Sequence, residues 1–188
     1  DVLVPRPETE TLVDAILNEN LQGKTLLELG TGSGAISISI AQENKDCFIF
    51  ATDISIKSIL VAKQNAEKFC SENIIFLNHD WNSEWLFPQV DYLISNPPYV
   101  NKEATTGKEE GIWHEPEKAL FSKDKGLSDL KLILTKGKNF LNENGKVYLE
   151  HAPDQYEELN KFAVEKGYLN FSNLDDLNGD KRVSIYQC

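Results

Sequence analysis

The protein has 188 residues, of which 19 are Lys or Arg and 30 are Asp or Glu, so its formal net charge at pH 7 is −11. This acidic balance argues against a scaffold built to hold duplex nucleic acid, because a polyanion is bound by clustered cations. Hydrophobic residues at 40% and charged residues at 26% describe an ordinary globular protein, and no apolar run approaches the ~20 residues of a spanning helix. We therefore expect one domain over residues 1–188 and no membrane contact.

The cysteines and histidines indicate neither a disulfide framework nor a metal site. Cys47, Cys70 and Cys188 form no C-x-x-C pair, which favours a reducing, cytoplasmic setting. We interpret Cys47 and Cys70 as small buried hydrophobes. The three histidines do not pair at ligand spacing, so no metal is predicted. The chain begins at Asp1 and contains no Met, which favours a fragment or a trimmed chain.

In the first half of the chain, β-rich apolar segments alternate with segments of helical period, the pattern of a doubly wound α/β sheet. A helix is expected from Thr9, after Pro7. The sequence Ala35–Glu43 alternates Ile with Ser, as a strand would, but its place after a Gly-rich turn favours a helix. Strands are expected at Thr25–Leu29 and Phe48–Thr52. A further helix is expected to be capped by Ser55 and to have an apolar face formed by Ile59, Ala62, Ala66 and Phe69.

The second half continues the alternation and ends in an antiparallel pair. Between Val100 and Gly126 lies a long polar stretch without a clear period, and loops of that length are usually functional. We expect strands at Ile74–Leu77, Tyr92–Ser95 and Lys146–Glu150. One helix is marked by Leu127, Leu130, Leu134 and Leu141, and a second, which ends before Gly167, by Tyr156, Leu159, Phe162 and Ala163. A closing antiparallel pair is expected at Tyr168–Phe171 and Val183–Tyr186.

A Gly-rich turn between a strand and a helix predicts a cofactor site. The turn consists of Gly30, Thr31, Gly32, Ser33 and Gly34. Glycines allow the backbone to approach a ligand closely, and the N–H groups of a helix start favour an electronegative group. The spacing also satisfies the dinucleotide pattern G-x-G-x-x-G/A, so a nicotinamide or flavin remains a candidate.

Asp53 closes the second predicted strand, 19 residues beyond Gly34. That distance suits a carboxylate that accepts hydrogen bonds from ribose hydroxyls. Together with the turn, Asp53 indicates an adenosine-type ligand without specifying which one. A charge that complements the dipole of the next helix explains Asp53 as well.

The sequence Asn96-Pro97-Pro98-Tyr99 follows a predicted strand directly, where open α/β sheets bind their ligands. Two prolines remove two backbone donors and leave rigid, unpaired carbonyls. The Asn96 side-chain oxygen and the Pro97 carbonyl can accept both N–H bonds of a planar NH₂ group, while Tyr99 lies against its face. This arrangement suits an amide or an exocyclic amine. A Pro-Pro turn that only closes the strand is the alternative.

The segment His79–Asn82 ends the third strand region, on the cofactor side of the predicted sheet. Asp80 can accept a hydrogen bond from an adenine amine, and Trp81 can pack on the adenine ring. The alternative is a buried aromatic residue with a solvated neighbour. Trp85 and Trp113 lack such a position and are interpreted as packing residues.

The chain resembles the release factor glutamine methyltransferases, class I S-adenosylmethionine enzymes that methylate the side-chain amide nitrogen of the glutamine in the Gly-Gly-Gln loop of peptide chain release factors. The residues that carry the resemblance are LVPRPETE at Leu3–Glu10, LELGTGSGAI at Leu27–Ile36, TDIS at Thr52–Ser55, NA at Asn65 and Ala66, SNPPYV at Ser95–Val100, EPEKAL at Glu115–Leu120, GL at Gly126 and Leu127, LEH with Gln155, and the terminal NGDKRV.

The resemblance implies the class I fold, a mostly parallel seven-stranded sheet with a C-terminal antiparallel strand. It implies S-adenosylmethionine as cofactor, S-adenosylhomocysteine as product and a release factor as partner. Cofactor contacts are implied for Gly30–Gly34, Asp53, Trp81 and Asn96, with Asn96–Tyr99 holding the glutamine. Arg6 and Glu8 match the N-terminal motif and are implied to border the site, although a helix-start role also explains Glu8.

The chain departs from the family at two places. The family's N-terminal helical domain is expected to be absent from this chain, which leaves the docking of the protein substrate open. Ala152-Pro153 follows LEH where glycine is common in the family, and this difference concerns only the local turn.

Two other functions remain open at this point. A nucleic-acid methyltransferase acting on adenine N6 or guanine N2 would use the same acceptor pair, but it must also bind phosphates and extrude the base, which a net charge of −11 disfavours. A non-catalytic scaffold that binds a nucleotide-like ligand is the second alternative, and such a scaffold has no use for two rigid unpaired carbonyls.

Overall fold

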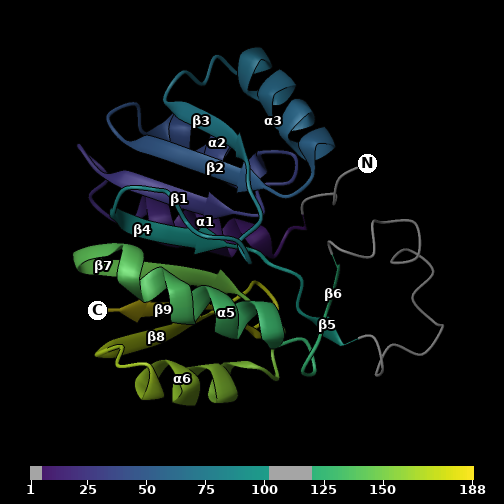
Figure 1. The fold of residues 1–188 in the computed structure, drawn as a ribbon, viewed down its shortest axis with the longest axis vertical. Helices are drawn as coiled ribbons and strands as arrows, with labels where there is room; N and C mark the ends of the chain where they lie inside the picture. Colours follow the sequence, from purple (N-terminus) through teal and green to yellow (C-terminus); the bar gives the residue numbers. More distant parts are fainter. Residues whose placement is uncertain (1–5, 102–119) are drawn as a thin grey trace.

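The computed structural model describes residues 6–101 and 120–188, which form a seven-stranded sheet with helices on both faces (Figure 1). Its strands are β1 (Thr25–Leu29), β2 (Phe48–Asp53), β3 (Ile74–Asn78), β4 (Val90–Ser95), β7 (Leu141–Glu150), β8 (Asn170–Asp175) and β9 (Lys181–Gln187). The helices are α1 (Thr9–Leu17), α2 (Ala35–Glu43), α3 (Ile56–Lys68), α5 (Ser128–Gly137) and α6 (Tyr156–Glu165), with a 3₁₀ turn at Lys138–Phe140.

The strand order is β3-β2-β1-β4-β7-β9-β8. Strands β3, β2, β1, β4 and β7 are parallel, and β9 runs antiparallel to both of its neighbours, β7 and β8. This topology confirms the predicted mostly parallel sheet with a C-terminal antiparallel strand. Strands β2 and β3 are added on one side of β1, and β4 is then added on the other side, so the strand order reverses between β1 and β4. This point of the sheet is where open α/β folds bind ligands.

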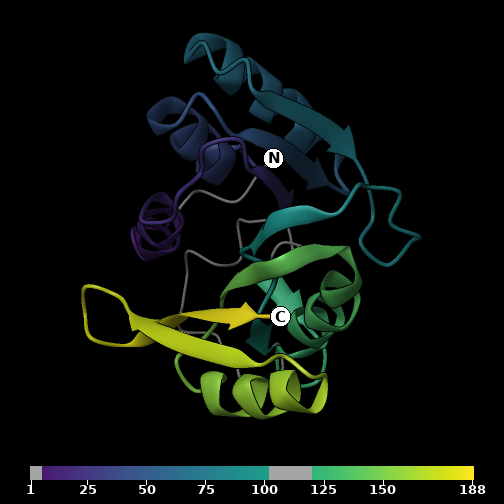
Figure 2. The ribbon, with the colours of Figure 1, turned by 90° about the vertical axis from the view of Figure 1, so that its left-hand side faces the viewer.

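The sheet separates two apolar cores, one on each face. Leu93 and Val147 pack with α5 and α6, whereas the next residues along the same strands, Ile94 and Tyr148, pack with α1 and α2. Figures 1 and 2 show α1 and α5 on opposite sides of the sheet. Both faces of the central strands are therefore buried, which explains why β1 and β4 are mostly apolar rather than alternating.

The predicted helix at Ala35–Glu43 is confirmed, despite its strand-like alternation. Five of its nine residues are buried, including Ser37, so most of the helix surface is covered by its neighbours. Under such burial, the position of a segment decides its structure and local periodicity does not. Ser55 caps α3 as predicted, because its side chain accepts a hydrogen bond from Ser58 N at 3.3 Å.

Three assignments were wrong at the ends of elements. Phe69 and Cys70 lie beyond α3, which ends at Lys68, so Phe69 is 51% exposed and Cys70 is an exposed thiol with φ +52°. Leu141 begins β7 and pairs with Val90 rather than ending a helix. Cys47 is buried, as predicted. Phe69 and Leu141 continued a helical period past the point where the backbone leaves the helix, whereas Cys70 was wrongly expected to be buried.

The stretch predicted as a loop between Val100 and Gly126 contains two short parallel strands, β5 (Val100–Asn101) and β6 (Phe121–Ser122). Trp113 lies outside the described residues, whereas Trp85 is 5% exposed and packs in the core, as predicted.

Within the described ranges, the helices are too short or too polar to cross a bilayer.

Candidate active site

The sheet brings the Gly-rich turn and the Asn-Pro-Pro-Tyr segment together at one edge. Leu29, the last residue of β1, pairs with Ser95, the last residue of β4, and also with Thr52 near the end of β2. The arrowheads of β1, β4 and β7 point to the same edge, on the right of Figure 1. Sequence segments that are 66 residues apart therefore begin side by side.

The Gly-rich turn packs tightly against α3 and against Trp81. Gly34 has φ +83°, and a Cβ atom there would lie 2.9 Å from Ile38 Cδ1 and 3.1 Å from Ala62 Cβ. A Cβ at Gly30 would lie 3.1 Å from the Trp81 ring, whereas a Cβ at Gly32 would meet no atom of the described residues within 4 Å. The turn thus has a packed side at Gly34 and an open side at Gly32, where a ligand can approach the backbone.

The turn's backbone N–H groups differ from the sequence expectation. Gly30 N and Thr31 N both donate to Thr52 O at 2.8 Å, and Gly34 N donates to Thr31 O at 2.8 Å. Gly32 N donates to Asp53 Oδ2 at 2.9 Å. These four groups serve the fold, so they are not the donors that an electronegative ligand would meet. The glycines of the turn instead allow a ligand to approach the backbone closely.

Asp53 lies at the end of β2, next to the turn. Its Oδ2 accepts from Gly32 N at 2.9 Å and its Oδ1 accepts from Ser55 N at 2.8 Å. An ionised carboxylate has about four acceptor positions. Asp53 therefore ties the turn to the start of α3 and retains acceptor capacity for ligand hydroxyls.

Glu28 is the acidic residue that the sequence analysis missed. Its side chain is buried directly below the turn, where Oε2 accepts from the hydroxyls of Thr31, at 2.8 Å, and Ser37. Its Oε1 is buried and has no hydrogen-bond partner among the described residues. Burial raises the pKa of Glu28 to about 6. The signal in the sequence was a lone acid inside an otherwise apolar strand, Thr25–Leu29, where burial without a function is costly.

Trp81 and Asp80 follow β3 and face different environments. Trp81 packs against Gly30, and its Nε1 donates to Asp129 Oδ1 at 3.2 Å. Asp80 Oδ1 accepts from Asn82 N at 2.8 Å, and this backbone bond lowers the pKa of the Asp80 carboxyl. The structure therefore places Trp81 beside the turn, while Asp80 stabilises a turn of its own.

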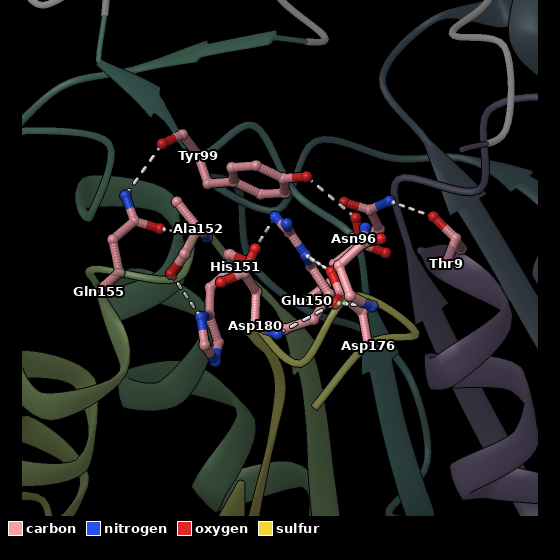
Figure 3. Close-up of polar contacts among 11 residues, drawn as sticks. Thr9, Asn96, Tyr99, Glu150, His151, Ala152, Gln155, Asp176 and Asp180 are labelled. Carbon is pink, nitrogen blue, oxygen red and sulfur yellow. Dashed lines mark hydrogen bonds and ion pairs between the residues drawn. The ribbon is translucent and has the colours of Figure 1, made fainter. Parts of the chain in front are cut away.

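Asn96 and the two prolines leave the end of β4 as an irregular segment whose prolines are buried. Asn96 Nδ2 donates to the hydroxyl of Thr9, the first residue of α1, at 3.1 Å. This bond uses the NH₂ group of the side-chain amide, so the Oδ1 oxygen is left for another partner. Figure 3 shows Asn96 between Thr9 on one side and Tyr99 on the other.

Tyr99 is fixed at both ends. Its hydroxyl donates to Glu150 Oε1 at 3.0 Å, and its carbonyl accepts from Gln155 Nε2 at 2.9 Å. Burial and the neighbouring Glu150 carboxylate raise the pKa of the Tyr99 phenol. Tyr99 is therefore neutral near pH 7, and it is held at its hydroxyl by Glu150 of β7 and at its carbonyl by Gln155, just before α6 (Figure 3).

Gly126 allows the chain to pass close to Tyr99. It has φ +88°, and a Cβ there would lie 2.0 Å from Tyr99 O and 2.5 Å from Gln155 Nε2. Gln155 also donates to Lys125 O at 3.1 Å and accepts from Ala152 N at 2.9 Å. One side chain thus joins three segments of the chain, and its neighbourhood has no room for a methyl group at position 126.

Arg6 and Glu8 precede α1. Arg6 is exposed, and Glu8 is the N-cap residue of α1 but makes no side-chain capping bond. Glu8 is close enough to Glu150 for its charge to raise the pKa of the Glu150 carboxyl. Glu8 therefore lies at the start of α1, where a negative charge complements the helix dipole, and close to Glu150.

Comparison with known proteins identifies the family of this fold and site. Residues 7–124 match the family model "Methyltransferase small domain". The chain is 34% identical over 191 residues to the release factor glutamine methyltransferase of Francisella tularensis, covering 100% of this chain and 67% of that protein. The chain belongs to the release factor glutamine methyltransferase family. The relatives from Shewanella oneidensis and Escherichia coli K12 are each 33% identical over 184 residues, or 97% of this chain.

This chain spans 64% of the length of the Shewanella relative and 66% of the length of the Escherichia relative.

Solved structures of methyltransferases share the fold of this chain. A methyltransferase from Pyrococcus furiosus superposes with a TM-score of 0.72 at 21% identity, covering 100% of this chain and 85% of that one. A ribosomal protein L11 methylase from Lactobacillus delbrueckii gives 0.71 at 16% identity, covering 100% and 80%.

The buried Glu28 predicts a dependence of stability on pH. A carboxyl whose pKa is raised from 4.5 to about 6 by folding binds more protons in the folded state, so its contribution to the free energy of unfolding falls as pH rises through that interval. We expect the stability of the wild type relative to Glu28→Gln to fall by about 2 kcal/mol between about pH 4 and about pH 7.5 in urea denaturation. A pH-independent difference would contradict this prediction.

Gly126→Ala tests the close approach to Tyr99. We expect it to lower the free energy of unfolding by about 3 kcal/mol, because the new methyl group must displace a backbone carbonyl. Gly179→Ala is the matched control, since Gly179 has φ +85° but nothing within 4 Å of its Cβ position. The control should cost only the backbone strain, about 1 kcal/mol, and equal losses in both variants would remove the steric argument.

Proposed function

We propose that this chain transfers a methyl group from S-adenosylmethionine to the side-chain amide nitrogen of the glutamine in the Gly-Gly-Gln motif of peptide chain release factors, releasing S-adenosylhomocysteine. The observation that carries this proposal is the position of Asn96. Its amide is held by Thr9 at the carboxyl end of β4, one strand away from the Gly-rich turn that follows β1. Membership of the family supports the same substrate, since relatives bear that name.

The residues around the turn fit S-adenosylmethionine, which supplies an electrophilic methyl group when bound. The buried Glu28 Oε1 has no hydrogen-bond partner among the residues that the structure describes, and such a carboxyl oxygen suits a cationic group of a ligand. Asp53 would accept from the ribose hydroxyls, and Trp81 would flank the adenine. The open space at Gly32 admits the ligand to the backbone. The contacts implied for Thr31, Ser33 and Asn96 are part of the same proposal.

The acceptor end of the site must activate a poor nucleophile. An amide nitrogen is weakly nucleophilic because its lone pair is delocalised. In the proposed complex, Asn96 Oδ1 and the Pro97 carbonyl accept the two N–H bonds of the glutamine amide, and the Tyr99 ring lies against its face. Acceptors fixed before the substrate arrives raise electron density on nitrogen and hold it in line with the methyl group. Pro98 contributes by keeping the Pro97 carbonyl rigid.

The proton balance requires no strong base. The bond from nitrogen to the methyl carbon forms as the bond from the methyl carbon to sulfur breaks, and the nitrogen then carries a positive charge and two protons. Such a nitrogen is acidic, so one proton passes to water. Tyr99 does not serve as the base, because its raised pKa keeps the phenol protonated.

A nucleic-acid amine methyltransferase remains the main competing function, because an exocyclic amine would fit the same two acceptors. The net charge of −11 disfavours it, since the enzyme would have to hold phosphates. A non-catalytic scaffold is disfavoured by the fixed amide of Asn96, which a scaffold does not need. A release factor as substrate favours a cytoplasmic setting and no direct nucleic-acid contact.

The decisive experiment is mass spectrometry of a release factor incubated with this chain and S-adenosylmethionine. We expect one methyl group on the Gly-Gly-Gln glutamine and none on a release factor whose motif carries Gly-Gly-Glu. DNA and RNA oligonucleotides are incubated in parallel. Methylation of an oligonucleotide with an unmodified release factor would favour the competing function, and no transfer to any acceptor would favour the scaffold.

Asn96→Ala tests the acceptor role. We expect at least a ~100-fold loss in the rate constant for methyl transfer, because a hydrogen bond made in the transition state is removed. Affinity for S-adenosylmethionine, measured by calorimetry, should change by less than about threefold, because Asn96 is only one of several implied cofactor contacts. A variant with undiminished turnover would refute the assignment.

Asp53→Ala tests the ribose contact. Loss of hydrogen bonds to a charged group should weaken S-adenosylmethionine binding by about 10- to 100-fold. Asp14→Ala, at an exposed position of α1, is the matched control and should leave affinity unchanged. Thermal denaturation of Asp53→Ala checks that the lost bonds to Gly32 and Ser55 have not unfolded the chain. Unchanged affinity in Asp53→Ala would mean that the ribose lies elsewhere.

A further inference from the structure

The Thr9 hydroxyl joins two buried parts of the site that are far apart in sequence. Thr9 is 7% exposed and lies at the start of α1, and its Oγ1 accepts from Asn96 Nδ2 at 3.1 Å, across 87 residues of sequence. A hydroxyl has one hydrogen to donate and two acceptor positions. Once the oxygen accepts from Asn96, its own hydrogen is directed to a second group.

Glu150 is the acceptor available to that hydrogen, because the Thr9 side chain is close enough to lower the pKa of the Glu150 carboxyl. The Glu150 side chain is completely buried; Oε1 accepts from Tyr99 OH at 3.0 Å, whereas Oε2 makes no hydrogen bond within the described part of the chain. Burial raises the pKa of the Glu150 carboxyl, while the nearby Thr9 hydroxyl, Tyr99 and Arg182 lower it. A carboxyl oxygen without a partner can accept a hydrogen bond, so the Thr9 hydroxyl can turn its hydrogen toward Oε2.

We propose that Thr9 and Glu150 are positioning residues that fix which end of the Asn96 amide faces the substrate. With the Thr9 hydrogen directed to Glu150, the Thr9 oxygen can only accept, so it selects Asn96 Nδ2. Asn96 Oδ1 is then left for the substrate. If the amide rotated by half a turn, its NH₂ group would face the NH₂ group of the glutamine, two donors would meet, and the acceptor pair would be lost. This inference rests on the proposed function.

Arg182 and Tyr99 hold the carboxylate end of this arrangement. Arg182 Nε donates to Asp176 Oδ2 at 3.3 Å, and Arg182 Nη1 donates to His151 O at 3.4 Å. These bonds anchor the guanidinium near Glu150, where its charge stabilises the carboxylate. Figure 3 shows Thr9, Asn96, Tyr99 and Glu150 as one cluster at the ends of α1, β4 and β7. The cluster therefore depends on elements from both halves of the chain.

Thr9→Val removes the hydroxyl and keeps the shape of the side chain. We expect kcat for transfer to a release factor to fall about tenfold, as the loss of one oriented hydrogen bond predicts. The KM for the release factor and the affinity for S-adenosylmethionine should stay within about twofold. Thr9→Ser restores the hydroxyl and should recover most of the loss. Thr135→Val is the matched control, because Thr135 Oγ1 donates to Lys131 O on the exposed face of α5, and it should leave kcat unchanged.

Glu150→Gln tests the second residue. Its amide NH₂ can donate to Thr9, which frees the Thr9 hydrogen for Asn96 and removes the selection of Nδ2. We expect a kcat loss of similar size. Because both residues act on one amide, the Thr9→Val/Glu150→Gln double variant should lose little more than either single variant. Multiplied losses would show that the two residues act independently and would overturn the coupling.

A spectroscopic measurement tests the bond without catalysis. In a ¹H–¹⁵N spectrum of the full chain, the Asn96 side-chain NH₂ signal is identified by its absence in Asn96→Ala. We expect this signal to shift in Thr9→Val and Glu150→Gln and to return toward the wild-type position in Thr9→Ser. An unmoved signal, or equal kcat in Thr9→Val and wild type, would overturn the inference. If the wild type methylates no release factor but the signal shifts as expected, the proposed function fails while the orientation of Asn96 stands.

Discussion

The pairing of β1 with β4 determines the geometry of the proposed site. Parallel pairing that aligns Leu29 with Ser95 makes the two segments that follow, the Gly-rich turn and Asn96–Tyr99, start at the same level of the sheet. The hydroxyl of Ser95 reinforces this alignment by donating to Leu29 O at 2.7 Å. Strand pairing is strongly specified when both faces are buried, because a slip by one residue exchanges the side chains of the two faces. The packing of the two cores therefore also fixes the distance between the cofactor and acceptor ends.

Two buried acids lie at this edge of the sheet, and each belongs to one half of the site. Glu28 is below the turn and receives hydroxyl donors, and Glu150 is below the Asn96 segment and receives the Tyr99 hydroxyl. In both cases burial raises the pKa of the carboxyl, and one oxygen has no direct partner among the described residues. Burying an acid without full compensation costs stability. Such a cost at both ends of one site is typical of groups kept for function.

The acceptor segment is rigid because three separate elements hold it. Thr9 of α1 binds the Asn96 amide, Glu150 of β7 binds the Tyr99 hydroxyl, and Gln155, just before α6, binds the Tyr99 carbonyl. Prolines alone fix two φ angles, but they do not fix how the segment sits relative to the sheet. The surrounding contacts supply that second constraint, and a site for a weak nucleophile depends on such preorganisation.

The sequence by itself determined the order of elements, the mostly parallel sheet, the Gly-rich turn, Asp53 and the Asn-Pro-Pro-Tyr segment, because periodicity and turn chemistry act over a few residues. The ends of α3 and of the helix before Leu141 were misjudged, since an apolar residue such as Phe69 or Leu141 keeps a helical period after the backbone has left the helix. Only the tertiary structure decided that four N–H groups of the turn are used internally and that Glu28 is buried beneath it. It also decided that the Asn96 amide meets the Thr9 hydroxyl, because that contact joins residues 87 positions apart through the sheet pairing and through no local pattern.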